Sequence, residues 1–147
     1  MGTVQAAAER SIAAPPERVY ALIADYREGR PKVLPGSFVD YRVEQGGQGA
    51  GTVVAYTLHA ARRERAYRLE VSEPQPGRVL RESDASSTFS QEWTVQPEGT
   101  GTRLRIACSW EGAGGVGGFF ERTFAPKGVG RLYEEICDRV ERECAGP

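Results

Sequence analysis

Apolar residues recur with two different periods along the chain, and the change of period divides it into regions. Residues 3 to 13 alternate weakly between apolar and polar, as in a strand. The segment that begins at Pro16 has its apolar residues at helical spacing, and a proline is tolerated in a first helical turn. From residue 38 to 111 the period is two, and from 116 to 144 it is helical again. The pattern predicts a strand, a short helix, a series of strands and a long C-terminal helix.

The region with period two divides into six strand-like runs. Their sequences are SFVDYRVEQ, GTVVAYTLHA, RERAYRLEVSE, GRVLRES, STFSQEWTVQ and TRLRIACSWE. Turn residues separate them, for example Gly46 to Gly49 and Pro74 to Gly77, and such short connections favour an antiparallel meander. Residues 27 to 36, before the first run, hold two prolines and two glycines, so we expect a loop or a broken short helix there.

Alternation within the runs indicates which side chains share the covered face of the sheet. In the last run Leu104 and Ile106 fall on one face, while Arg103 and Arg105 fall on the other. The apolar face must be the covered one. The same logic turns a further set of side chains inward: Val54, Tyr56, Leu58, Tyr67, Leu69, Val71, Phe89, Gln91, Trp93, Val95, Cys108 and Trp110.

The C-terminal segment carries a single apolar stripe. Its members are Val129, Tyr133, Ile136, Cys137, Val140 and Cys144. Pro126 and Gly128 interrupt the helical pattern. We therefore expect a short helical piece around 117 to 124, a break, and a final helix of about four turns from residue 128 onward.

A glycine-rich stretch, WEGAGGVGGFFERTF at residues 110 to 124, joins the last run to this helix. Its Gly112, Gly114 and Gly117 match the G-x-G-x-x-G pattern of dinucleotide-binding loops. Such a site also needs a parallel strand after the helix, and no strand pattern follows here. We interpret the stretch as a flexible hinge flanked by aromatic residues. The stretch GGQGAG at 46 to 51 lies between two runs and is best interpreted as a hairpin turn.

Size and charge narrow the classes of function. A length of 147 residues predicts a single domain, covering 1–147. The chain has 19 basic and 20 acidic residues, and this balance lacks the basic excess that a nucleic-acid partner would require. No apolar block approaches the length of a membrane span, so we expect no stable membrane insertion and a cytoplasmic protein.

The cysteines and the histidine argue against a metal site. The chain has 3 cysteines and 1 histidine. Cys137 and Cys144 would lie about 10 Å apart along a helix and could not form a disulfide. Their spacing matches no zinc pattern, so we expect structural roles for the cysteines.

Few residues have the pattern of catalytic groups. His59 falls on the face opposite Tyr56, so a surface histidine is favoured over a general base. The cluster Ser86-Ser87-Thr88 lacks a G-x-S-x-G context and an evident base, which argues against a hydrolase nucleophile. Glu92 and Glu111 could form a carboxylate pair only if the predicted faces were wrong for one strand.

Two groups of charged residues could rim a pocket and bind a carboxylate or phosphate head group. The first is Asp25 and Arg30, near the first loop, and the second is Arg62, Arg63 and Arg65. The plainer interpretation, which we prefer, is that the arginines lie on the exposed edge of a strand, where their charges prevent pairing with other chains.

The order of elements is similar to the helix-grip fold of the START-like superfamily, and local sequences strengthen the similarity. ERSIAAPPERVYALIADY resembles the opening strand and helix start of the family, and GQGAGTVVAYTL its glycine-led strand. EWTVQPEGTGTRLRI resembles its tryptophan-containing hairpin, and FFERTFAPKGVGRLYEEICDRV its broken C-terminal helix. The resemblance covers nearly the whole chain and is closest to bacterial polyketide cyclase/dehydrase-like and lipid-transport-like members.

This resemblance implies an α+β fold in which a curved antiparallel sheet of about seven strands wraps around the long C-terminal helix and encloses a cavity. The inward side chains then become candidate cavity lining: Tyr56, Tyr67, Leu69, Phe89, Gln91, Trp93, Cys108, Trp110, Phe120, Phe124 and Tyr133. About half of them are expected to be plain core, Trp93 and Tyr133 foremost, with Trp110, Phe120 and Phe124 as a gate near the hinge.

The leading hypothesis is the binding of a small hydrophobic or amphipathic ligand such as a polyketide, fatty acid, isoprenoid or sterol-like compound, with no cofactor. The alternative is a cyclase or dehydratase that uses Tyr56, Tyr67, Gln91 or His59 to activate a carbonyl or take a proton. A third possibility, a protein-interaction module, would require an exposed apolar patch that the alternation does not predict.

Overall fold

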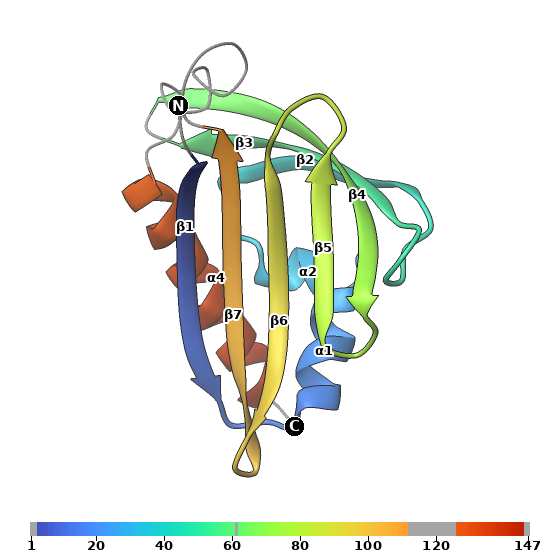
Figure 1. Cartoon of the computed structure of the whole chain (residues 1–147), viewed down its shortest axis with the longest axis vertical. Coiled ribbons are helices and arrows are strands. Elements are labelled where there is room, and N and C mark those ends of the chain that lie inside the picture. Colours follow the sequence, from blue (N-terminus) through green and yellow to red (C-terminus); the bar gives the residue numbers. More distant parts are fainter. Residues whose placement is uncertain (1–2, 61, 112–125, 146–147) are drawn as a thin grey trace.

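The structure is a computed structural model that describes residues 3–60, 62–111 and 126–145 (Figure 1). Its elements follow the predicted order. They are β1 (Thr3–Ile12), α1 (Pro16–Ala24), α2 (Gly29–Val33), β2 (Phe38–Gln45), β3 (Val53–Ala60), β4 (Arg63–Gln75), β5 (Val79–Asp84), β6 (Ser90–Glu98), β7 (Gly101–Glu111) and α4 (Pro126–Ala145). None of the helices in these ranges is both long and apolar enough to cross a membrane.

The seven strands form one antiparallel sheet in the order β1-β7-β6-β5-β4-β3-β2. From β2 to β7 each strand pairs with its neighbour in sequence, so the predicted meander is confirmed. The first strand is added at the end, because β1 pairs with β7 from Thr3 opposite Glu111 to Ile12 opposite Thr102. The arrangement is the curved sheet expected for a helix-grip fold.

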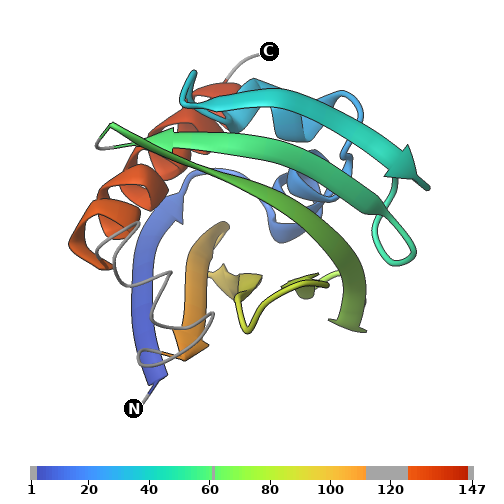
Figure 2. The same cartoon turned by 90° about the horizontal axis from the view of Figure 1, so that it is seen from above.

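The sheet curves around an interior that the helices close. Seen from above, β2, β3 and β4 arch over β1, β7 and β6, and α4 lies on the open side of the curve (Figure 2). The predicted apolar stripe of α4 is its buried face. The final helix begins two residues earlier than predicted, because Pro126 starts α4 and Gly128 lies in its first turn, where a proline leaves no hydrogen bond unmade. The expected short helical piece around 117 to 124 lies outside the described residues.

The edge strand β1 is fastened to α4 by an ionic cluster. The Arg10 guanidinium contacts Glu134 at 3.0 Å, Asp138 at 2.8 Å and Glu141 at 2.9 Å. These carboxylates stand on successive turns of one helix face, so a single side chain on the strand meets all of them. The cluster holds the helix against the edge of the sheet that it covers.

The strand before the Pro74 turn is longer than predicted. Pro74 lies inside β4, which continues to Gln75. The pairing of β4 with β5 shifts register between Ser72 and Gln75, and such an irregularity tolerates a residue without a backbone N–H. The strand therefore continues through Pro74 and ends one residue after it.

The glycine turn between β2 and β3 docks onto the end of α1. The Tyr26 N–H donates to the Gly47 carbonyl at 2.9 Å, and the Gly49 N–H donates to the Ala24 carbonyl at 3.0 Å. Gly49 has a positive φ of 53°, and a Cβ there would collide with the Glu73 carboxylate. The stretch GGQGAG is thus a hairpin turn, as predicted, and it also positions the helix pair.

Replacing Gly49 with alanine should destabilise the protein by about 1–3 kcal/mol, because the new side chain is strained at positive φ and displaces Glu73. Gly36→Ala is the matched control, since a Cβ at Gly36 meets nothing within 4 Å. Its effect should stay within about 0.5 kcal/mol. Urea unfolding measures both values, and equal stabilities of the two variants would contradict the docking role.

Candidate functional site

Five aromatic side chains form a continuous row across the inner face of the sheet. They are Phe38 on β2, Tyr56 on β3, Tyr67 on β4, Phe89 just before β6, and Trp110 on β7. Successive ring centroids are 5.2, 5.4, 5.0 and 6.4 Å apart. Tyr56 and Tyr67 are directly opposite in the pairing of β3 with β4, which explains their contact. The row makes a broad apolar wall along the concave face.

A buried carboxylate lies beside this wall. Glu82, on β5, is fully buried and accepts hydrogen bonds from three side chains besides its cationic partner. Gln91 Nε2 donates at 2.6 Å and Trp93 Nε1 at 3.1 Å, both to Oε1. Arg30 Nη1 lies 2.8 Å from Oε2, and the Tyr26 hydroxyl donates to the same oxygen. Glu82 is therefore a satisfied acceptor at the centre of a polar network.

Arg30 reaches this network from α2 and is itself buried, with 3% of its surface exposed. Its Nε donates to the Ile23 carbonyl at 3.1 Å, and its guanidinium lies 3.9 Å from the Trp93 ring centroid. Arg30 does line a pocket, the small cavity described below, but its charge is not available to a carboxylate or phosphate head group, because Glu82 inside the sheet already supplies the opposite charge.

The network continues from Glu82 to α4 with a fixed direction. An ionised carboxylate only accepts hydrogen bonds, so Gln91 must turn its amide nitrogen toward Glu82. The other end of the amide, Oε1, accepts a hydrogen bond of 2.7 Å from the Tyr133 hydroxyl on α4. The orientation of Gln91 is thus determined by the ion pair behind it.

A small cavity opens between the network and the aromatic row. Its volume is about 20 Å³, which is room for roughly one water-sized group. The cavity is lined by Arg30, Leu34, Phe38, Tyr41, Val54, Tyr56, Gln91, Trp93, Tyr133 and Ile136.

A second buried ion pair closes the turn between β5 and β6. Arg65 Nη2 lies 3.1 Å from Asp84, and the Arg65 guanidinium stands over the Tyr67 ring at 5.2 Å. Asp84 also accepts hydrogen bonds from the Ser86 N–H at 3.1 Å and the Ser87 hydroxyl at 3.0 Å. The strand-edge interpretation is therefore wrong for Arg65, and the serine cluster holds a turn.

Burial controls the protonation of the inner face. It raises the pKa of the Tyr56, Tyr67 and Tyr133 hydroxyls well above their ordinary value, and that of the Cys108 thiol to about 11. At neutral pH all four groups keep their protons. They can donate hydrogen bonds to a ligand, but they are poor bases and nucleophiles.

The outer face of the sheet holds the remaining titratable candidates. The His59 side chain is half exposed, which confirms the predicted surface position, and its Nε2 lies 3.4 Å from Glu64. Glu92 forms an ion pair with Arg81 at 2.6 Å, and Glu111 is exposed at the end of β7. The predicted faces were correct for both strands, so Glu92 and Glu111 form no inward carboxylate pair.

The predicted cavity residues are all buried wherever the structure describes them. The aromatic row takes in four of them, and the cavity touches Tyr56, Gln91, Trp93 and Tyr133. Leu69 and Cys108 are buried on the same inner face, with Trp110 at the end of the row. Phe120 and Phe124 lie outside the described residues.

Sequence reasoning missed the two inward carboxylates. Leu80, Glu82 and Asp84 alternate with Arg81 and Ser83, and their buried positions follow that alternation. Leu80 is apolar and therefore expected to face inward, and Glu82 and Asp84 follow it at intervals of two, so they are expected on the same face. The signal was present, but a run with four polar residues in succession offers a weak pattern for assigning faces.

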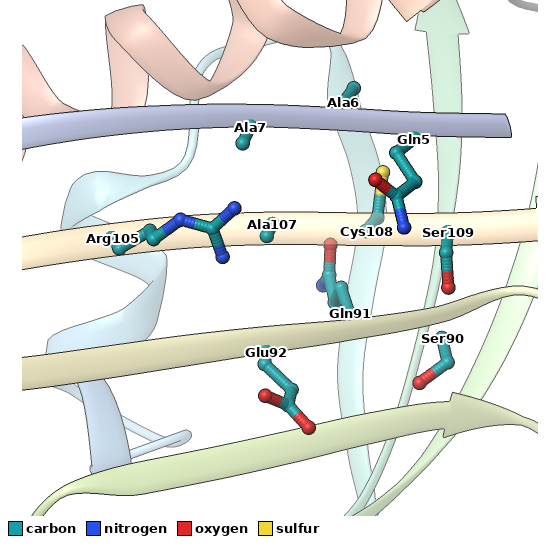
Figure 3. Close-up of a pocket in the computed structure, with 10 residues that line it drawn as sticks. All are labelled: Gln5, Ala6, Ala7, Ser90, Gln91, Glu92, Arg105, Ala107, Cys108 and Ser109. Atoms are coloured by element: carbon teal, nitrogen blue, oxygen red, sulfur yellow. The ribbon is translucent and has the colours of Figure 1, made fainter.

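An open hollow of about 310 Å³ lies on the outer face of β1, β7 and β6. Ala7 and Ala107 floor it, and polar side chains stand around them (Figure 3). Its charged residues already have partners, since Arg105 lies 3.4 Å from Glu9 and Glu92 is paired with Arg81. The hollow results from small side chains in a solvated face, so the inner face remains the candidate site.

A family model described as polyketide cyclase / dehydrase and lipid transport matches residues 3–145. The solution structure of KanY protein is 40% identical over 99% of this chain and 100% of its own, with a TM-score of 0.87. TTHA0849 from Thermus thermophilus is 24% identical over 97% of each chain, with a TM-score of 0.77.

The fold also extends to a plant enzyme. Norcoclaurine synthase from Thalictrum flavum, solved in complex with dopamine and hydroxybenzaldehyde, is 15% identical over 97% of this chain and 86% of its own, with a TM-score of 0.72. At this identity the likeness concerns the fold alone. No curated protein matches the sequence.

Replacing Glu82 with glutamine should cost about 3–5 kcal/mol of stability, because the Arg30 charge is left buried without its counter-ion. Glu92→Gln is the matched control on the other face of the adjacent strand, where an exposed pair contributes at most about 1 kcal/mol. Urea unfolding distinguishes the two, and a stability loss at Glu82 no larger than that at Glu92 would contradict the central role of the carboxylate.

Stability should fall in alkaline solution. The folded pKa of Cys108 is raised to about 11, so its contribution is complete below the unfolded pKa of about 8.5 and is lost as the pH rises toward 11. The buried tyrosines act in the same direction. A urea-unfolding series across this range should show the decline, and Cys108→Ser should make it shallower. A stability that stays constant to about pH 11 would refute this account.

Proposed function

The chain belongs to the polyketide cyclase/dehydrase and lipid transport family, and we propose that it binds a small hydrophobic or amphipathic molecule in its interior, as a carrier, sensor or sequestering protein. A polyketide, a fatty acid, an isoprenoid or a sterol-like compound has the required chemistry. The observation that carries the proposal is the aromatic row, which places a wide apolar wall beside a buried polar network.

The predicted cavity residues form the binding surface in this proposal. The ligand body packs against Tyr67, Phe89 and Trp110, and its polar end reaches the cavity beside Gln91 and Tyr133. Burial of about 200–300 Å² of apolar ligand surface contributes roughly 5–8 kcal/mol before ordering costs, which is enough for micromolar affinity. A group larger than one oxygen atom and its hydrogens enters the cavity only when the neighbouring rings move apart.

The chemistry of the described inner face favours binding over catalysis. His59, one of the groups on which the enzymatic alternative relied, lies on the outer face. Tyr56 and Tyr67 keep their protons at neutral pH because burial raises the pKa of both. The inward carboxylates Glu82 and Asp84 are each held by an arginine. Among the residues that the structure describes, a cyclase or dehydratase would thus find hydrogen-bond donors but no available base.

The two tryptophans, Trp93 and Trp110, provide an intrinsic probe, since both lie on the inner face. Titration with a naphthalene-sized apolar compound should quench their fluorescence in a saturable way. Phe89→Leu removes one ring from the wall and should weaken binding about threefold to tenfold.

Leu104→Val is the control, because it truncates the same inner face away from the aromatic row. Its ligand affinity should equal that of the unchanged protein. Failure of the unchanged protein to bind any apolar probe would overturn the proposed function, and equal losses in the two variants would overturn the role of the aromatic wall.

A further inference from the structure

Two polar ends of the cavity face a ligand, the Tyr56 hydroxyl and the Gln91–Tyr133 pair, and the ion pair fixes the direction of the second. We infer that the polar end of the ligand is a neutral hydroxyl group on an unsaturated ring, a phenol or an enol. This inference rests on the proposed function and specifies its ligand. The hydroxyl accepts a hydrogen bond from Tyr56 and donates one to the pair formed by Gln91 and Tyr133.

The donor is the hydroxyl of Tyr56. Its side chain is buried, with 7% of the residue exposed, and it lines the cavity. No residue that the structure describes is hydrogen-bonded to this hydroxyl, in contrast to those of Tyr26, Tyr41 and Tyr133. A ligand oxygen that accepts its proton therefore adds a hydrogen bond without displacing one between protein groups.

The acceptor is the Gln91–Tyr133 pair. Glu82, neutralised by Arg30, only accepts, so Gln91 directs its amide hydrogens toward Glu82 and presents Oε1. Tyr133 uses its proton on that oxygen. Gln91 Oε1 keeps a second lone pair for a further donor, whereas the Tyr133 oxygen already contacts the Cys108 thiol. A ligand group at this end of the cavity must therefore bring a proton of its own.

Other polar groups fit the cavity less well. A ketone or an ether can accept from Tyr56, but it turns a lone pair toward the acceptors of Gln91 and Tyr133. A carboxylate also turns only lone pairs toward these acceptors, and it adds a negative charge. The nearby Arg30 charge is already neutralised by Glu82, so the new charge would be buried without a counter-ion. The cavity volume of about 20 Å³ suits one hydroxyl group and is too small for a carboxylate.

The ring follows from the side chains around the hydroxyl subsite. The Tyr56 ring lies between Phe38 and Tyr67 in the aromatic row, with Tyr41 stacked at 6.4 Å. A planar unsaturated body continues this arrangement, because offset and edge-to-face contacts between rings add to the energy of apolar burial.

Four naphthalene-sized probes test the inference by tryptophan fluorescence or calorimetry at neutral pH. They are 2-naphthol, 2-methoxynaphthalene, naphthalene and 2-naphthoate. We expect 2-naphthol to bind at least about tenfold more tightly than 2-methoxynaphthalene, the factor that one hydrogen bond provides. Binding of 2-naphthoate should be the weakest of the polar probes.

Tyr56→Phe removes the donor alone. The affinity for 2-naphthol should fall about fivefold to tenfold, while the affinity for naphthalene stays the same. Thermal stability of the free variant should equal or exceed that of the unchanged protein, because the lost hydroxyl has no partner among the described residues. Tyr20→Phe is the matched control, since the Tyr20 hydroxyl is bonded to Glu73 outside the cavity, and it should change none of these affinities.

The outcomes separate this inference from the proposed function. Equal binding of 2-naphthol and 2-methoxynaphthalene, or tighter binding of 2-naphthoate, would overturn the hydroxyl subsite and leave the ligand-binding function standing. An equal loss of 2-naphthol and naphthalene affinity in Tyr56→Phe would overturn the role of the donor. Absence of binding by all four probes would overturn both proposals.

Discussion

The rest of the inner face depends on one buried ion pair, between Arg30 of α2 and Glu82 of β5. Moving two charges from water into a protein interior costs several kcal/mol for each ion, and their attraction compensates only when the remaining hydrogen-bonding positions are also filled. Here they are filled by Tyr26, Gln91 and Trp93 on the carboxylate and by the Ile23 carbonyl on the guanidinium. The pair therefore links the helix pair to the middle of the sheet, and the carboxylate charge determines the direction of the hydrogen bonds from Tyr26, Gln91 and Trp93.

The alternation of the strands predicted the antiparallel meander and its inner face, and the resemblance to a known family supplied the helix-grip fold. Tyr56, Tyr67 and Trp110 face inward because each shares its parity with buried aliphatic residues on the same strand. The ion pair was not predicted, because burial of Arg30 depends on a carboxylate that is distant in sequence and contributed by another element. Local patterns report which face a residue occupies, whereas pairing across the core is a property of the tertiary structure.

Proline and glycine were less reliable guides than the hydrophobic pattern. Pro126 was expected in the break before the final helix and is instead its first residue, and Pro74 was expected in a turn and lies within β4. In both places the missing N–H falls where no regular hydrogen bond is needed, at a helix start or at a shift in strand pairing. The effect of such a residue depends on its position within the element, which sequence alone locates only approximately.

A polar network inside an apolar binding face has a consequence for ligand choice that the apolar surface alone lacks. Aromatic side chains bind many different apolar molecules with similar free energies, so the wall from Phe38 to Trp110 gives affinity but little discrimination between ligands. Discrimination requires buried polar groups that lose free energy when left unpaired. Gln91 and Tyr133 are such groups, and their directions are set by Glu82 rather than by the ligand. In the proposed function, selectivity therefore comes from this fixed orientation of Gln91 and Tyr133, and affinity comes from the breadth of the aromatic row.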